Sequence, residues 1–394
     1  MPIRSRSSGC RAPLPHMCTP VMSTRTSDAT CPPSGELERE MHTGTAGFSA
    51  SDTSHGPRPE SLPGAKAPLA LGLASLAPEA RVIIVRTGGL GDTILVLPTV
   101  ETLRAAYPSA TFALVGSVWA EALHGMVPGA VQMTHIDRAF LSVRRGGNAT
   151  DLFAASDAVI VYTATPDSDL VAYARSVCPG PLVVWPVTPA PGIHAARHLA
   201  NAVFPASSNP DPLPRPSLEC PPAMRFEVRE WLERQFGRGA GPVAVHPGSG
   251  GRRKCWPARR FAECINRLAE PVLLVEGPAD TDACRECAEA IDPSLPVVRA
   301  TEWPLPRLAA LLTESRAYLG NDSGVSHVSG ALGVPTVAVF GPTDPAVWTP
   351  LGARVAVVAP RGDELWPTVD DVLCAVRKEF GGGLPRSDSG GAPR

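Results

Sequence analysis

The sequence predicts an α/β protein with two doubly wound, Rossmann-like domains that face a central cleft. Two observations predict this fold class. Short apolar, β-branched runs alternate with stretches of helical pattern, and the alternation is interrupted once, by a proline-dense stretch, before it resumes. Strands that alternate with helices form parallel sheets, and such sheets bind ligands at the carboxyl ends of their strands. Two such sheets joined by a linker therefore leave a binding cleft between them.

Length and charge fit this organisation. The chain has 394 residues, of which 44% are hydrophobic and 19% charged, so it can bury the cores of two domains. The formal net charge of -2 gives no general attraction to nucleic acid, and we expect no nucleic-acid partner. The ten cysteines are scattered rather than arranged as a disulfide framework, which favours a cytoplasmic location.

Two terminal segments are predicted to be disordered tails, because residues 1–78 and 381–394 are rich in small and turn-forming residues and lack helix or strand periodicity. No run approaches the ~20 apolar residues that span a bilayer. The basic first residues are not followed by the apolar segment of a secretory signal. We therefore expect at most a peripheral contact with the inner membrane.

The first domain is predicted at 79–205. It opens with the apolar run 82–85, the pattern of a buried parallel strand, and continues through a glycine loop into a helical pattern at 92–106. Pro98 predicts a break in that helix, because proline lacks an N–H and clashes with the preceding turn. Further strands are expected at 111–115, 158–161 and 182–185.

A linker is predicted at 206–222, where the density of proline excludes helices and central strands. The second domain is predicted at 223–380. Its expected strands are 243–246, 272–276, 297–299, 317–320 and 336–340, and its expected helices are 257–268, 280–291, 305–313, 324–332 and 369–380.

The first motif with chemical potential follows the first strand and runs from Arg86 to Asp92. Its glycines allow a tight turn and close approach of the backbone to a ligand. It is not a dinucleotide fingerprint, because the third glycine of that pattern would stand where Ile94 does, and it lacks the Lys-Ser/Thr of a phosphate loop. Asp92 begins the following helix, so it is either a helix cap or a general base.

Two further motifs follow strands of the second domain. A loop of small residues leads to Lys254 and a helix at Pro257, which suits a phosphate or is an ordinary basic surface loop. The run 321–327 contains Asp322-Ser323-Gly324 at a helix start. Free N–H groups there, with the Ser323 hydroxyl, suit a diphosphate, although the same residues also make a good helix cap.

In this order the motifs resemble glycosyltransferase family 9, the heptosyltransferases. Segment 81–98 resembles the family's strand, small-residue loop, Gly-Asp and downstream Leu-Pro, and 246–257 resembles its donor loop ending in Lys-x-Trp-Pro. Segment 321–327 resembles its Asp-Ser/Thr-Gly-x-x-His element, and 340–345 its Tyr/Phe-Gly-Pro-Thr-Asp-Pro signature. The resemblance spans about residues 81 to 380.

The resemblance implies the GT-B architecture, with an N-terminal acceptor-binding domain and a C-terminal nucleotide-sugar donor-binding domain. It implies an inverting, metal-independent glycosyltransferase with no cofactor. The expected donor is a nucleotide diphosphate sugar, ADP-heptose in the first instance. The expected acceptor is a lipopolysaccharide-core or other cell-envelope saccharide, free or lipid-linked.

Residue roles follow from the resemblance, motif by motif. Asp92 is the expected general base. The expected donor-binding residues are Ser249, Gly250, Lys254, Asp280, Trp303, Asp322, Ser323, Gly324 and His327. Among them, Asp280 stands near the family's ribose-binding acid and Trp303 near its base-contacting position. The expected acceptor-binding residues are Arg86, Gly88, Gly89 and Gly91.

The sequence departs from the family where Gly88-Gly89 replaces serines and Glu276 replaces a glycine. Two other function classes stay open on this architecture. One is a nucleotide-sugar epimerase or hydrolase, which would release an altered sugar without an acceptor. The other is a non-catalytic nucleotide-sugar-binding protein, in which Asp92 would only cap its helix.

Overall fold

Two parallel β-sheets organise the computed structural model, which describes residue 73 and residues 76–129, 131–136, 152–204, 211–239 and 241–380. The predicted tails lie outside the described residues, apart from residue 73 and residues 76–78. Leu73 is fully buried, and the Tyr107 hydroxyl donates to its carbonyl oxygen at 2.8 Å. Ordered structure therefore begins before the predicted domain boundary, in a stretch whose alanines, glycines and leucines show no period.

The first sheet has five strands in the order β3-β2-β1-β4-β5, each parallel to its neighbours. They are β1 (Arg81–Arg86), β2 (Thr111–Gly116), β3 (Val131–His135), β4 (Ala158–Tyr162) and β5 (Leu182–Trp185). Both faces are buried, because Val82 and Ile84 pack into one hydrophobic cluster and Ile83 and Val85 into another. This explains why the sequence of β1 is a continuous apolar run between its terminal arginines.

The second sheet has six parallel strands in the order β11-β10-β9-β6-β7-β8. They are β6 (Val243–His246), β7 (Val272–Glu276), β8 (Val297–Thr301), β9 (Ala317–Asn321), β10 (Thr336–Val339) and β11 (Val355–Val358). The chain changes direction across this sheet at β6, which lies between β7 and β9. Ligands of doubly wound folds bind beyond the carboxyl ends of the strands at such a point.

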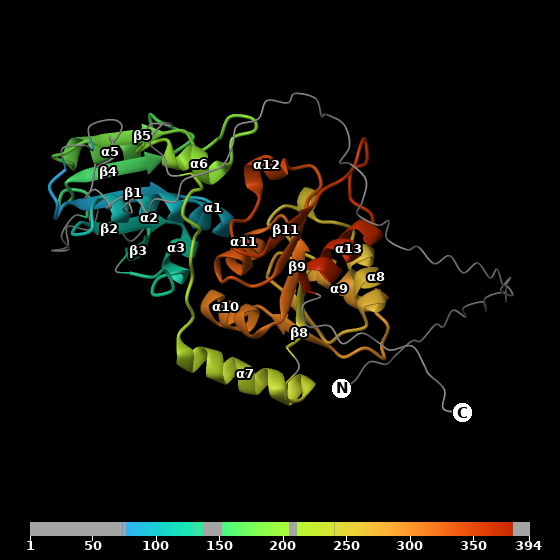
Figure 1. Cartoon of the computed structure of the whole chain (residues 1–394). Helices are drawn as coiled ribbons and strands as arrows, with labels where there is room; N and C mark the ends of the chain where they lie inside the picture. Colours follow the sequence, from blue (N-terminus) through green and yellow to red (C-terminus); the bar gives the residue numbers. More distant parts are fainter. Residues whose placement is uncertain are drawn as a thin grey trace, which may run out of the picture. The chain divides into compact units, whose positions relative to one another are not determined.

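Helices connect the strands of each sheet (Figure 1). Those of the first sheet are α1 (Leu90–Leu95), α2 (Leu97–Ala106), α3 (Val118–Ala122), α5 (Asp169–Val177) and α6 (Ala195–Ala200). Those that follow are α7 (Pro222–Phe236), α8 (Ala258–Leu268), α9 (Thr281–Ala290), α10 (Leu305–Glu314), α11 (Gly324–Ala331), α12 (Pro345–Trp348) and α13 (Val369–Phe380), with a short 3-10 helix at Arg252–Lys254. The predicted fold class, two doubly wound α/β units, is confirmed.

The predicted break at Pro98 is also confirmed. The helical stretch divides at Val96, and Pro98 stands in the first turn of α2, where a missing N–H costs nothing. The stretch begins earlier than predicted, however. Gly89 is the cap residue of α1, so Asp92 lies inside the first turn rather than at the cap.

The segment before α7 contacts both halves of the described chain. The Leu218 N–H donates to the Ala331 carbonyl at 3.1 Å, and the Glu219 N–H to the Met126 carbonyl at 2.8 Å. α7 then packs beside α10, where Arg225 and Arg229 of α7 both bond the Glu314 carboxylate (Figure 1). The end of the predicted linker is thus hydrogen-bonded to both halves. Its residues 206–210 lie outside the described part.

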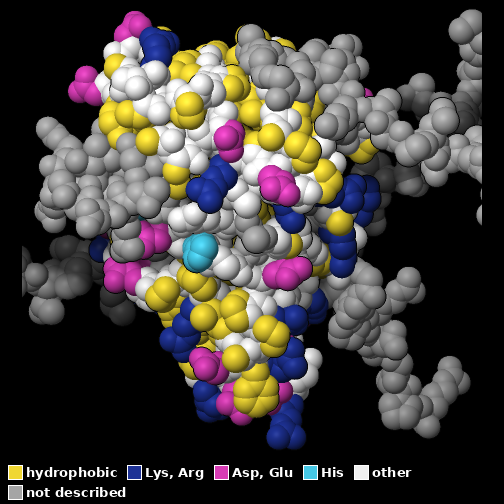
Figure 2. Space-filling model, turned by 90° about the vertical axis from the view of Figure 1, so that its left-hand side faces the viewer, with side chains coloured by type: hydrophobic (Ala, Val, Ile, Leu, Met, Phe, Trp, Pro, Cys, Tyr) yellow, Lys and Arg dark blue, Asp and Glu magenta, His cyan; other side chains and the backbone are white. Residues whose placement is uncertain are grey.

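Figure 2 shows one face of the molecule, where Lys and Arg side chains are interspersed with acidic and hydrophobic ones over the described residues. This mixture agrees with the formal net charge of -2. Among the described residues, no helix has the length and apolar character needed to cross a bilayer.

Candidate functional site

The loop between β1 and α1 holds Asp92 by two contacts. Its Oδ1 accepts from Nη2 of Arg86 at 2.6 Å, and its Oδ2 accepts from the Gly89 N–H at 2.8 Å. The Arg86 side chain is 8% exposed and that of Asp92 29%, so the carboxylate is the accessible partner. Burial lowers the pKa of the Arg86 guanidinium and Asp92 opposes that shift, but arginine remains a cation in proteins.

Gly88 lets the backbone approach this carboxylate. Its φ of +143° lies in a region that L side chains rarely adopt, and a Cβ there would stand 2.6 Å from Oδ2 of Asp92. The Ser117 hydroxyl donates to the Gly88 carbonyl at 2.8 Å and pins the loop to the start of α3. The glycines of this loop therefore position Asp92.

The loop after β6 meets the loop after β9 at Asp322. Lys254 Nζ and the Thr343 hydroxyl both donate to Oδ2 of Asp322, each at 2.8 Å, and the Ser249 hydroxyl donates to its carbonyl at 2.9 Å. Asp322 is 5% exposed and Lys254 38%, so the ammonium group reaches solvent. Gly250 has open space at its Cβ position. Four of the expected donor-binding residues are thus joined or adjacent here.

Asn321 joins the same two loops, and we did not predict it. It is fully buried, and its Nδ2 donates to the carbonyls of Pro247 and Gly248 at 2.7 and 3.1 Å. Its Oδ1 accepts the Trp256 N–H at 2.8 Å. One side chain thereby satisfies three backbone groups of the β6 loop. Its only sequence signal is an amide at the end of a buried strand, beside Asp322.

The first turn of α11 lies against the first turn of α1. Ser323 caps α11, with the Ser326 N–H 3.4 Å from its hydroxyl. A Cβ on Gly324 would stand 2.7 Å from Cβ of Leu90 and 3.2 Å from the Gly91 nitrogen. The structure therefore brings the helix that carries Asp92 against the helix that begins at the Asp322 loop.

His327 lies in this contact. A Cβ on Gly91 would stand 2.9 Å from its ring, and its Nδ1 is buried without a hydrogen-bond partner among the described residues. Burial lowers the pKa of His327 to about 4, although the charges of Asp322 and Asp92 act in the opposite direction. The ring is therefore neutral at pH 7.

Asp280 points inward. Its Oδ2 accepts from His246 Nε2 at 2.9 Å and from the Gly277 N–H at 3.1 Å, and the residue is 8% exposed. Burial alone would raise the pKa of this carboxyl, but hydrogen bonds from His246 and from the backbone of Gly277 and Ser249 outweigh it and lower the pKa. The resemblance placed a ribose contact here, whereas this carboxylate already has protein donors.

Trp303, expected near the nucleobase, packs within the protein. Its ring lies edge-on to Trp231 of α7 at 4.8 Å between centroids, and the Arg307 guanidinium lies 4.2 Å from its centroid. One face of the indole is thus occupied by a cation. Glu276, which replaces a family glycine, is buried at the end of β7 and paired with Arg299 of β8.

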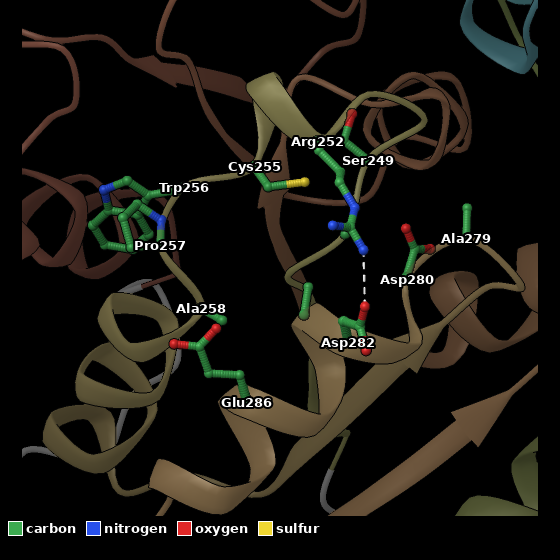
Figure 3. A pocket seen from close by; sticks show the side chains of 12 residues that line it. Ser249, Arg252, Cys255, Trp256, Pro257, Ala258, Ala279, Asp280, Asp282 and Glu286 are labelled. Atoms are coloured by element: carbon green, nitrogen blue, oxygen red, sulfur yellow. Dashed lines mark hydrogen bonds and ion pairs between the residues drawn. The ribbon is translucent and has the colours of Figure 1, made fainter.

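A pocket of about 250 Å³ opens beside the β6 loop (Figure 3). Ser249 and Asp280 line it, with Cys255 and Trp256, and Figure 3 shows Cys255 directed toward its interior. Arg252 and Asp282 form an ion pair of 2.8 Å, drawn across the pocket in Figure 3. Of the predicted donor-binding residues, only Ser249 and Asp280 belong to its lining.

Taken together, two doubly wound sheets and helix starts that meet beside a carboxylate and a lysine define a doubly wound α/β protein with a candidate anion site. Residues 210–368 match the model of Glycosyltransferase family 9 (heptosyltransferase). Lipopolysaccharide heptosyltransferase 3 of Escherichia coli is 30% identical over 139 residues, which are 34% of this chain and 41% of that protein. The match thus spans less than half the length of this curated relative.

Solved structures extend the likeness to both sheets. E. coli ADP-heptose lps heptosyltransferase II superposes with a TM-score of 0.64 at 20% identity, covering 77% of this chain and 99% of that one. E. coli heptosyltransferase WaaC with ADP gives a TM-score of 0.54 at 21% identity, covering 76% and 99%. At such identities the likeness establishes the fold. The predicted resemblance to glycosyltransferase family 9 is confirmed, and in sequence the family model matches residues 210–368.

Proposed function

We propose that the chain is an inverting, metal-independent glycosyltransferase. It transfers a sugar, heptose from ADP-heptose in the first instance, to a lipopolysaccharide-core or related cell-envelope saccharide. One observation carries the proposal. The first turn of α1, which carries Asp92, packs on the first turn of α11. Helix α11 begins just after Asp322, and Asp322 is bonded to Lys254. A proton acceptor and a phosphate-binding loop then serve one site. The solved relatives named for ADP and ADP-heptose support this choice of nucleotide.

In this site Asp92 accepts the proton of the acceptor hydroxyl as that oxygen attacks the anomeric carbon. Arg86 and the Gly89 N–H hold the carboxylate, each using one of its oxygens and leaving further lone pairs for the hydroxyl proton. On the donor side Lys254 and the N–H groups at the start of α11 offset the charge that the leaving diphosphate gains. Asp322 aims the lysine by pairing with Nζ.

Nucleotide binding tests the donor side. Titration calorimetry of the full chain with ADP, UDP, GDP and dTDP is expected to show preferential binding of ADP. Lys254→Ala should weaken that binding about tenfold, because a charge-assisted contact to phosphate is worth about 1.5–3 kcal/mol. Arg253→Ala, which removes an exposed cation one residue away, is the matched control and should bind like wild type. Tighter binding of another nucleotide would discard the heptose donor, and no binding at all would overturn the proposal.

Transfer kinetics test the base. Asp92→Asn keeps the shape of the side chain, should leave ADP affinity within a factor of about two, and should lower kcat by ~10²-fold or more, the value of general base catalysis. Asp169→Asn, an exposed carboxylate at the start of α5, is the control. Because the change leaves Arg86 without its anion, unfolding of each variant is measured alongside. Unchanged turnover, or release of altered sugar without any acceptor, would refute the assignment.

A further inference from the structure

A buried polar cluster lies beneath the two donor loops, and the proposed function gives most of it no role. It consists of His246 at the end of β6, Asp280 before α9, Tyr318 in β9, and Ser323 and Ser326 at the start of α11. Each is at most 8% exposed. We call this set the His246 cluster.

The Asp280 carboxylate is held by three protein donors. It receives hydrogen bonds from His246 Nε2 and from the backbone of Gly277 and Ser249. The backbone of Gly248 is packed so closely over it that a Cβ would stand 2.1 Å from its Oδ1. A carboxylate so enclosed has little room for the hydroxyls of a ribose.

Asp280 also determines which nitrogen of His246 carries the proton. An ionised carboxylate only accepts hydrogen bonds, so Nε2 of His246 must be the N–H. In the neutral ring Nδ1 is then an acceptor, and two hydroxyls face it: Tyr318 at 3.4 Å and Ser323 at 3.5 Å. Burial raises the pKa of the Tyr318 hydroxyl, which therefore keeps its proton.

The hydroxyl groups of the His246 cluster find their acceptors inside the protein. Ser326 donates its proton to the Asn321 carbonyl. The protons of Tyr318 and Ser323 then have two acceptors within reach, Nδ1 of His246 and Oγ of Ser326, which is 3.2 Å from each hydroxyl. Either pairing uses both protons inside the protein.

We propose that Asp280 and His246 are positioning residues that turn the Ser323 hydroxyl inward, so that α11 presents backbone N–H groups, not the serine hydroxyl, to the donor diphosphate. The proposal rests on the proposed function for the identity of the ligand. It reassigns Asp280 from the ribose to the support of the helix start. The Ser323 oxygen then acts as the helix cap, accepting from the Ser326 N–H.

The KM for the donor distinguishes the positioning role of Asp280 and His246 from the capping role of Ser323. Asp280→Asn replaces one acceptor oxygen by an NH2 group, which must face either the Ser249 N–H or the donors of Gly277 and His246. We expect this change, and His246→Gln, to raise the donor KM about tenfold or more, because displaced phosphate-binding groups lose much of their effect. The double variant should be no worse than the more damaged single one, since both break one support. Ser323→Ala should raise the donor KM less than about threefold.

The control is Glu289→Gln, an exposed carboxylate of helix α9 that does not line the pocket. The result that would overturn the proposal is the reverse pattern, a strong KM effect for Ser323→Ala and none for Asp280→Asn. A second comparison uses 2′-deoxy-ADP. If Asp280 held the ribose, wild type would discriminate against this analogue and Asp280→Asn would lose the discrimination. On our proposal the variant weakens ADP and 2′-deoxy-ADP by the same factor.

A measurement without nucleotide separates this proposal from the proposed function. In ¹⁵N NMR spectra of the wild-type chain, the His246 resonances, assigned by their absence in His246→Gln, should show a protonated Nε2 and an unprotonated Nδ1. The opposite tautomer would overturn the proton directions whatever the protein binds. The expected tautomer without binding of any nucleotide diphosphate would refute the proposed function and, with it, the role in donor binding.

Discussion

At the scale of single residues, carboxylates of the site are paired with cations or with imidazole. Asp92 pairs with Arg86, Asp322 with Lys254, and Asp280 with His246. Pairing satisfies a buried charge and at the same time fixes the direction of its partner. The proposed diphosphate site can therefore contain acidic residues, because Asp322 aims Lys254, which is the partner that reaches solvent.

His327 gives a prediction at this scale. Its folded-state pKa of about 4 lies below the ordinary histidine value of about 6.5, so the unfolded chain binds the proton first as pH falls. The stability associated with the neutral ring is therefore complete above pH ~6.5 and is lost between pH ~6.5 and ~4, by about 3 kcal/mol. Urea unfolding between pH 7 and 4 measures this loss. His327→Gln should flatten the curve over that window, and equal slopes in both proteins would contradict the burial argument.

Charged site residues that follow strands could be predicted from the sequence, because the carboxyl ends of parallel strands meet at one edge of the sheet. That reasoning predicted Asp92, Lys254 and Asp322 as candidates. It could not predict Asn321 or His246 as supports. Their partners come from other strands, at sequence separations of 65 residues for Asn321 to Trp256 and 34 for His246 to Asp280. Nothing in local spacing reports such contacts.

At the scale of elements, the strands buried on both faces were predicted, and so were the edge strands β5 and β8, at 182–185 and 297–299, whereas the edge strands β3 and β11 were not. β1, β4, β6 and β9 read as continuous apolar runs because both of their faces are covered. The edge strand β3, with sequence Val-Gln-Met-Thr-His, is partly exposed and mixes polar residues into the run. The edge strand β11 is short and half-buried. The partial exposure of β3 and β11 thus accompanies the weaker apolar signal of these two strands.

The division of α1 from α2 matters for the site. Pro98 ends the first helical piece after only six residues, at Leu95. The short α1 can therefore orient its first turn independently of the longer α2. Its first turn carries Asp92 and packs on α11 through Gly91.

At the scale of the whole molecule, the described residues belong to one compact unit, and one hydrophobic cluster contains side chains from both sheets. Further contacts join the two halves: α1 packs against α11, and Nε2 of His194 lies 2.9 Å from the Thr349 carbonyl. The segment before α7 also links them, because its Leu218 and Glu219 N–H groups bond Ala331 and Met126. Such contacts couple the stability of the half that contains the first sheet to that of the half that contains the second.

Gly324 is the position where this coupling can be tested, because a Cβ there must displace Leu90 or the backbone of Gly91. We expect Gly324→Ala to destabilise the chain by about 1–3 kcal/mol, the usual cost of overpacking, and to lower kcat because it moves α1 and Asp92 relative to α11. The stability control is Gly250→Ala, because a Cβ at Gly250 would meet open space. Calorimetry of wild type should show one main transition, and the larger Gly324→Leu should separate it into two. A single transition at the wild-type temperature in Gly324→Leu would mean that the α1–α11 contact does not hold the two sheets together.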